Sequence, residues 1–125
     1  MVIETGATIF VVDDDELVRD SLKTLIMTAG FRVEAFGSAR EFLANVAHKS
    51  SGILVLDVRM PGMTGLELLQ RVRAADPDMP FIMVTGNSDM DAVKAAGDLD
   101  VSAYIRKPYS PQQFGEKLMA VLDKL

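Results

Sequence analysis

The chain of 125 residues contains no cysteine and only one histidine, His48. Without cysteine there can be no disulfide, thiolate zinc site or cysteine nucleophile. The 13 lysines and arginines are outnumbered by 18 aspartates and glutamates, giving a net charge of −5, so we expect no binding to nucleic acid through a basic surface. The longest apolar run, residues 7–12, is far too short to span a membrane, and the start MVIETG does not resemble a signal peptide. We therefore expect a cytoplasmic protein that does not enter a membrane.

Hydrophobic residues make up 49% of the sequence, enough for one domain over residues 1–125 with a substantial core. Short apolar runs rich in β-branched residues alternate with segments whose apolar residues recur at helical spacing. Gly30 and Ser38 are suited to end one helix and to begin the next. The predicted strands are 7–12, 31–36, 52–57, 81–84 and 103–106. One predicted helix starts at 17 and is closed by Gly30, and a second follows Ser38. The other predicted helices are 66 to about 76, 89–96 and 111–125.

Strict alternation of strand and helix predicts an α/β fold with a parallel sheet between two layers of helices. Parallel neighbours need crossover connections, and these connections are right-handed. In such sheets ligands bind beyond the carboxyl ends of the strands. The residues that follow each predicted strand are therefore the candidates for a functional site.

Those residues are polar at four of the five strands. Asp13 and Asp14 follow the first strand, Asp57 ends the third, Thr85 follows the fourth, and Lys107 follows the fifth. Converging carboxylates repel one another, which raises pKa values unless a cation is bound. Mg²⁺ prefers oxygen ligands, whereas zinc prefers the nitrogen and sulfur ligands that this chain almost lacks. The pattern predicts a Mg²⁺ site.

Each residue also has a plainer interpretation. The acidic run can simply cap the next helix, with Asp15 as N-cap and neighbouring acids favoured by the helix dipole. Asp57 can be a turn residue ahead of Pro61 and Gly62. It is their joint placement at separate strand ends that favours a site.

The motifs at these strand ends resemble the receiver domain of two-component response regulators of the FixJ type, over nearly the whole chain. The resemblance implies a single (βα)₅ doubly wound, flavodoxin-like domain with strand order 2-1-3-4-5. The matching motifs are VDD at 12–14, LDVRMPGMTG at 56–65, VTG at 84–86 and YIRKPY at 104–109.

In that family the carboxylate corresponding to Asp57 attacks the phosphoryl group of a phosphohistidine. The resemblance implies that Mg²⁺ is held directly by Asp14 and Asp57, through water by Asp13, and by the backbone carbonyl of Arg59. It implies no enzyme in the usual sense, only phosphotransfer to the chain itself and autodephosphorylation.

The remaining motif residues are implied to sense the phosphoryl group. Lys107 would pair with Asp57 and then with a phosphoryl oxygen, and the Thr85 hydroxyl would move to donate to another. Gly86 would leave room for the group. Tyr104 would follow Thr85 inward, Pro108 would follow a cis peptide bond, and Arg59 and Asn87 would tune the lifetime of the phosphoryl group.

The output is implied to be a surface, formed by the fourth helix, the fifth strand and the fifth helix. Its partners would be a sensor histidine kinase or phosphotransfer protein upstream, and an effector protein or a fused output domain downstream, since no DNA-binding domain follows the last predicted helix. The signalling form would be either a monomer or a homodimer through the fourth and fifth helices.

One segment departs from the family pattern. Residues 98–101 read DLDV, and Asp100 stands where a turn glycine is expected. A non-glycine residue in a left-handed turn is strained, although Asp tolerates it better than most. We predict that Gly97 ends the fourth helix early and that residues 97–102 have raised mobility.

Two other classes compete with a switch. A phosphohydrolase of the haloacid dehalogenase type would carry a second acid two residues after its nucleophile, where this chain has Arg59, and would carry a cap domain. A phosphate-independent interaction module with the same fold would be favoured if an acceptor or sensing residue were missing, and none is. Dinucleotide binding is disfavoured because Asp13 and its neighbours replace the glycine-rich turn.

Overall fold

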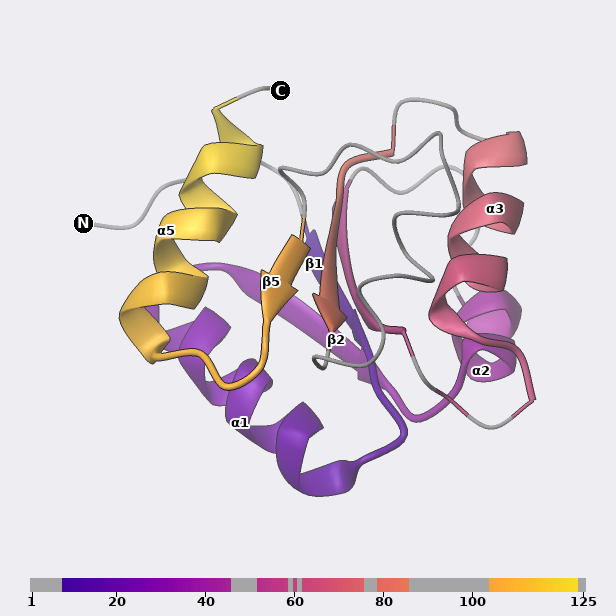
Figure 1. The fold of residues 1–125 in the computed structure, drawn as a ribbon, viewed down its shortest axis with the longest axis horizontal. Coiled ribbons are helices and arrows are strands. Elements are labelled where there is room, and N and C mark those ends of the chain that lie inside the picture. Colours follow the sequence, from indigo (N-terminus) through magenta and orange to yellow (C-terminus); the bar gives the residue numbers. More distant parts are fainter. Residues whose placement is uncertain are drawn as a thin grey trace.

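A five-stranded parallel sheet forms the middle layer of this computed structural model, which describes residues 8–45, 52–58, 60, 62–75, 79–85 and 104–123 (Figure 1). The strands are β1 (Thr8–Val12), β2 (Arg32–Phe36), β3 (Gly52–Asp57), β4 (Phe81–Thr85) and β5 (Tyr104–Arg106). They lie in the order β2-β1-β3-β4-β5, and every neighbouring pair is parallel. The predicted fold class and strand order are confirmed.

Helices cover both faces of the sheet. The described helices are α1 (Glu16–Thr28), α2 (Ala39–Asn45), α3 (Gly65–Ala75) and α5 (Pro111–Leu122). Figure 1 shows α1 and α5 on one side of the sheet and α2 and α3 on the other. The helix predicted at 89–96 lies outside the described residues, as do the predicted mobile segment 97–102 and His48.

Successive strand residues point to opposite faces, so each strand contributes to two separate cores. In β1, Ile9 and Val11 pack with α1 and α5, whereas Phe10 and Val12 pack with α2 and α3. All six residues of β3, the central strand, are buried. The edge strand β2 alternates exposed with partly or fully buried residues because only one of its sides is well covered.

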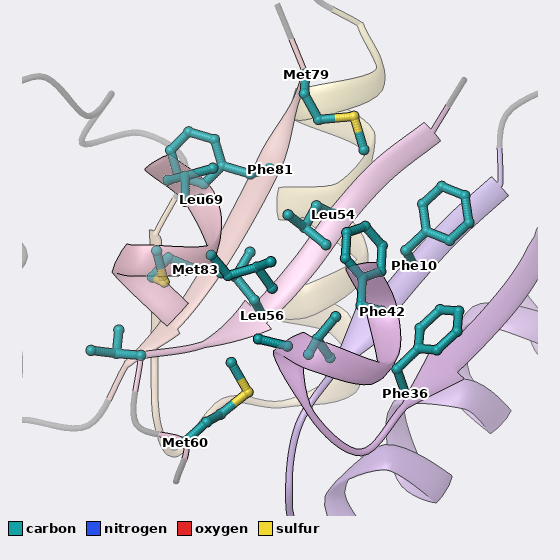
Figure 2. Packing of buried hydrophobic residues seen from close by; sticks show 14 of the residues in the cluster. Phe10, Phe36, Phe42, Leu54, Leu56, Met60, Leu69, Met79, Phe81 and Met83 are labelled. Carbon is teal, nitrogen blue, oxygen red and sulfur yellow. The ribbon is translucent and has the colours of Figure 1, made fainter. Parts of the chain in front are cut away.

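Aromatic rings organise the core beneath α2. Phe42 lies between Phe10 of β1 and Phe36 of β2, and both contacts are edge-to-face, with ring centroids 5.7 and 5.5 Å apart (Figure 2). This geometry is the preferred one for aromatic pairs. It anchors a helix of only seven residues to the sheet.

The helix ends follow from the residues at them. Gly30 has φ +94° directly after the C-cap residue Ala29, a conformation that favours glycine. The Ser38 hydroxyl accepts from the backbone N–H of Glu41, as its predicted capping role requires. Ser110 forms a reciprocal capping box with Gln113 at the start of α5.

Candidate functional site

The sheet register brings the polar strand ends to one edge. Val12 pairs with Leu56, Asp57 pairs with Val84, and Thr85 pairs with Arg106. Asp13 therefore follows β1 at the level where Asp57 ends β3, and Lys107 leaves β5 beside Thr85. The backbone N–H of Lys107 donates to the Thr85 carbonyl over 2.7 Å, which fixes this exit from the sheet.

Three carboxylates meet at this edge. Oxygens of Asp13, Asp14 and Asp57 lie within 4.8 Å of one another. Asp13 is only 2% exposed and Asp57 9% exposed, whereas Asp14 is open to solvent. Hard oxygen ligands with one open side suit Mg²⁺, which binds few carboxylates and retains several waters. The donor set and its spacing fit the predicted cation.

Asp13 is held by hydrogen bonds of its backbone and of its carboxylate. Its backbone N–H donates to the carbonyl of Phe36, and one carboxylate oxygen accepts from the N–H of Asp15 over 2.9 Å. Burial raises the pKa of Asp13 to about 6; the N–H of Asp15 opposes that rise and the Asp57 carboxylate adds to it. A buried acid with a raised pKa next to a second acid needs a compensating cation when it is ionised.

Asp15 has a different role from its two neighbours. Its carboxylate accepts from the N–H groups of Leu17 and Val18 and caps α1. The capping interpretation of the acidic run is thus right for Asp15, while Asp13 and Asp14 belong to the carboxylate cluster.

Lys107 supplies the positive charge at the site. Its Nζ donates to Oδ2 of Asp57 over 3.1 Å, with the side chains 37% and 12% exposed. The peptide bond between Lys107 and Pro108 is cis, the isomer that the resemblance implies. The compact ammonium of Lys107 is also close enough to contact an anionic group attached to Asp57.

The first residue of α3 packs against the backbone of Asp57. Gly65 donates its N–H to the carbonyl of Val58 at the start of α3, and a Cβ on Gly65 would overlap the backbone carbonyl of Asp57. Thr64 caps α3 reciprocally with Glu67, whose pKa is lowered by the backbone N–H of Thr64. The close contact at Gly65 keeps the end of β3 fixed.

Thr85 and Tyr104 lie on the other flank of the site. Thr85 is fully buried at the end of β4. Tyr104 is buried as well and packs in the core shared with α2 and α3. Tyr104 thus already occupies an inward position, before any movement of Thr85.

Several candidate residues lie outside the described part of the chain. These are Arg59, Gly86 and Asn87, whose predicted roles in metal binding, phosphoryl accommodation and lifetime stay predictions.

Three residues that border the site had no predicted role. Arg19 donates from Nη1 to the Asp13 carbonyl over 2.9 Å. Gly65 lies against Asp57 as described above. Tyr109 packs on Phe114 with ring centroids 5.8 Å apart, and burial, then Asp13 and Asp57, raise its pKa. Of these three residues, only Gly65 could have been identified from the sequence, because it stands between a threonine that can cap a helix and an apolar helical segment.

Among the described residues, no helix has the length and apolar character needed to cross a membrane.

The sequence matches the family model of the response regulator receiver domain over residues 9–119. It is 41% identical over 123 residues to the C4-dicarboxylate transport transcriptional regulatory protein DctD of Rhizobium meliloti, covering 98% of this chain and 26% of that protein. It is 40% identical to the transcriptional regulatory protein FixJ of Bradyrhizobium diazoefficiens, covering 95% of this chain and 56% of the relative. The chain therefore spans from about a quarter to just over half of these relatives.

Solved structures agree with the sequence comparison. Full-length FixJ from B. japonicum superposes with a TM-score of 0.82 at 36% identity, over 96% of this chain and 59% of that one. A receiver domain protein from Clostridium thermocellum superposes with a TM-score of 0.84 at 26% identity, over 94% of this chain and 95% of that one. With these matches and the carboxylate cluster at the strand ends, the chain belongs to the response regulator receiver domain family of two-component systems.

Proposed function

We propose that this chain is a phosphorylation-activated switch in which Asp57 accepts a phosphoryl group from a phosphohistidine. The observation that carries the proposal is the cluster of Asp57 with Asp13 and Asp14, oxygens within 4.8 Å, and a lysine 3.1 Å from Asp57. The donor would be a sensor histidine kinase or a phosphotransfer protein.

The reaction is an in-line displacement at phosphorus. A carboxylate oxygen of Asp57 forms the new O–P bond as the N–P bond of the phosphohistidine breaks, and the electron pair leaves with the imidazole nitrogen. The products are an acyl phosphate on Asp57 and a free histidine. The backbone contact with Gly65 and the pairing of β3 with β4 support this role, because they fix the backbone from which the attacking carboxylate projects.

A cation is part of the proposal. Asp14 and Asp57 would hold Mg²⁺ directly, with Asp13 contacting it through water and Arg59 through its backbone carbonyl. When bound, Mg²⁺ neutralises charge on the transferred phosphoryl oxygens and orients them for transfer. The buried Asp13, whose pKa is raised to about 6, supports the need for a cation at neutral pH.

Lys107 and Thr85 would report the modification. Lys107 would exchange the Asp57 carboxylate for a phosphoryl oxygen, and the Thr85 hydroxyl would donate to another, with Gly86 leaving room for the group. Moving a 1:99 population to 99:1 takes about 5.5 kcal/mol, which a few charge-assisted bonds in a partly dry site can supply. We expect the Thr85 hydroxyl and the Lys107 ammonium to move, with any shift of Tyr104 coupled to that of Thr85. Arg59 and Asn87 would set how long the phosphoryl group lasts.

The output surface would comprise the predicted helix 89–96, β5 and α5. Two relatives carry the name transcriptional regulatory protein, and this chain spans 26% and 56% of their length. We propose that the signal passes to an effector protein or to a fused output domain, in the cytoplasm, either from a monomer or from a homodimer formed through this surface.

Intact mass spectrometry tests the acceptor role. After incubation with acetyl phosphate and Mg²⁺, the native chain should gain about 80 Da, one phosphoryl group, in a labile form. Asp57→Asn, and the native chain in EDTA, should gain nothing. Asp20→Asn, which removes an exposed carboxylate from α1, should gain as much as the native chain. No gain by a folded, Mg²⁺-binding native chain would refute acceptance from acetyl phosphate and favour either a phosphate-independent interaction module or a receiver that accepts only from its own kinase.

A further inference from the structure

The loop that carries Asp13 and Asp14 is tied to the first turn of α1 by a side chain that does not belong to the carboxylate cluster. Arg19 donates from Nη1 to the backbone carbonyl of Asp13 over 2.9 Å, and its own backbone N–H donates to the carbonyl of Asp15 over 2.9 Å. Arg19 therefore contacts the acidic loop on both sides of Asp14.

We propose that Arg19 is a positioning residue for the cation site, which sets the Mg²⁺ affinity by fixing the peptide unit between Asp13 and Asp14. This inference rests on the Mg²⁺ site of the proposed function. The carbonyl of Asp13 and both flanking Cα atoms lie in one peptide plane. A hydrogen bond that fixes the carbonyl direction therefore also fixes the Cα positions from which both carboxylates project.

Arg19 acts on the Asp13 carbonyl itself. The backbone N–H of Asp13 is bound by Phe36, and the bond from the N–H of Asp15 to the Asp13 carboxylate spans the same peptide unit and restrains it from the side-chain end. The bond from Arg19 adds a direct contact with the carbonyl oxygen. Asp14 is exposed, so its direction depends on the backbone before it more than on packing.

The neighbouring loop leaves space for the guanidinium group. A Cβ on Gly37 would lie 3.2 Å from Nη1 of Arg19 and 3.5 Å from Oε2 of Glu41, which accepts from the N–H of Gly37. Gly37, the residue after β2, thus lies against the guanidinium group, and the Arg19 side chain is half-buried there.

Charge and positioning predict effects of opposite sign. A cation near three carboxylates weakens the attraction for Mg²⁺, so neutralising Arg19 should strengthen Mg²⁺ binding if charge alone mattered. If Arg19 positions the loop, the same substitution should weaken binding despite the favourable change in charge. Residues that orient metal ligands typically change metal affinity by about 10- to 100-fold when replaced.

The test is a titration of the whole chain with MgCl₂, followed by the amide NMR signals of the acidic loop. Arg19→Met retains the apolar stem and removes the donor, and Arg19→Lys retains the charge and one donor. Lys23→Met removes the same charge one turn further along α1, from an exposed side chain. If Arg19→Met does not fold, Arg19→Gln replaces it with the same expectation.

We expect Arg19→Met to bind Mg²⁺ about tenfold more weakly, Arg19→Lys to fall between it and the native chain, and Lys23→Met to bind no more weakly than the native chain. The Mg²⁺ concentration for half-maximal phosphorylation by acetyl phosphate should rise by the same factor, with an unchanged plateau. Equal or tighter binding by Arg19→Met would overturn the positioning role and leave the proposed function intact. A native chain that binds Mg²⁺ but is not phosphorylated would count against acceptance from acetyl phosphate and leave the positioning role intact, and a native chain that binds no Mg²⁺ would overturn both proposals.

Discussion

Lys107 donates from Nζ to Oδ2 of Asp57 over 3.1 Å, although the two residues are 50 positions apart in the sequence. The contact crosses from the end of β3 to the loop after β5, with β4 lying between the two strands in the sheet. Because Lys107 is 37% exposed, solvent screens the pair and its contribution to stability is small. The position of Lys107 therefore matters for the chemistry of the site more than for the fold.

Replacement of Lys107 should separate modification from response. Lys107→Ala should change the free energy of unfolding by less than about 1 kcal/mol and still gain one phosphoryl group from acetyl phosphate. The amide NMR shifts that phosphorylation produces in β5 and α5 should shrink, because no ammonium follows the phosphoryl oxygen. The full set of native shifts in the phosphorylated variant would contradict the sensing role.

The buried carboxylate of Asp13 should make the metal-free protein less stable as pH rises. Its folded pKa, about 6, lies above the ordinary value of 3.8, so the folded state binds the proton more tightly and loses that advantage between pH 4 and pH 6. In EDTA at pH 7, Asp13→Asn should be more stable than the native chain by on the order of 2 kcal/mol, since the amide oxygen can still accept from Asp15. Urea unfolding followed by far-UV circular dichroism should show this gain shrink toward pH 4; a gain independent of pH would contradict the assignment.

Two glycines in helices should respond to alanine in opposite directions. Gly65→Ala forces a Cβ into the backbone of Asp57 and should destabilise the chain by about 1–3 kcal/mol. Gly115→Ala, inside α5, meets no atom within 4 Å and should stabilise the chain by about 0.5–1 kcal/mol. Urea unfolding curves give the free energy of unfolding of both variants. A Gly65→Ala variant more stable than the native chain would show that α3 does not pack closely against the backbone of Asp57.

The aromatic contact beneath α2 should be a main source of stability. Phe42→Ala removes a ring that touches both Phe10 and Phe36 and should lower the free energy of unfolding by about 3–5 kcal/mol. Phe42→Leu should lose less because it fills more of the space. A loss below 1 kcal/mol for the alanine variant would mean that α2 is held by other contacts.

The strands and the edge where they end were predictable because their pattern is local. Each buried strand is a short apolar run, and parallel strands bring their carboxyl ends to the same side, so Asp13, Asp57, Thr85 and Lys107 follow from position alone. The helix ends at Gly30 and Ser38 were also local signals, and each does what was expected there.

Contacts that depend on packing were beyond the sequence. The division of the acidic run into a cap, Asp15, and two cluster residues depends on where the first turn of α1 starts. The bond from Arg19 to the Asp13 carbonyl joins a side chain to a backbone atom, and no residue pattern predicts it. The buried position of Tyr104 likewise depends on the core beneath α2 and α3 rather than on its neighbours in the chain.

The order of the strands along the chain also decides when the site is completed during synthesis. Its carboxylates come from the ends of β1 and β3, and its ammonium comes from beyond β5, which is synthesised after the other four described strands. A chain in which β5 is not yet made therefore holds the carboxylates but lacks the Lys107 ammonium. We therefore expect the sensing role proposed for Lys107 to be available only to molecules in which β5 has joined the sheet.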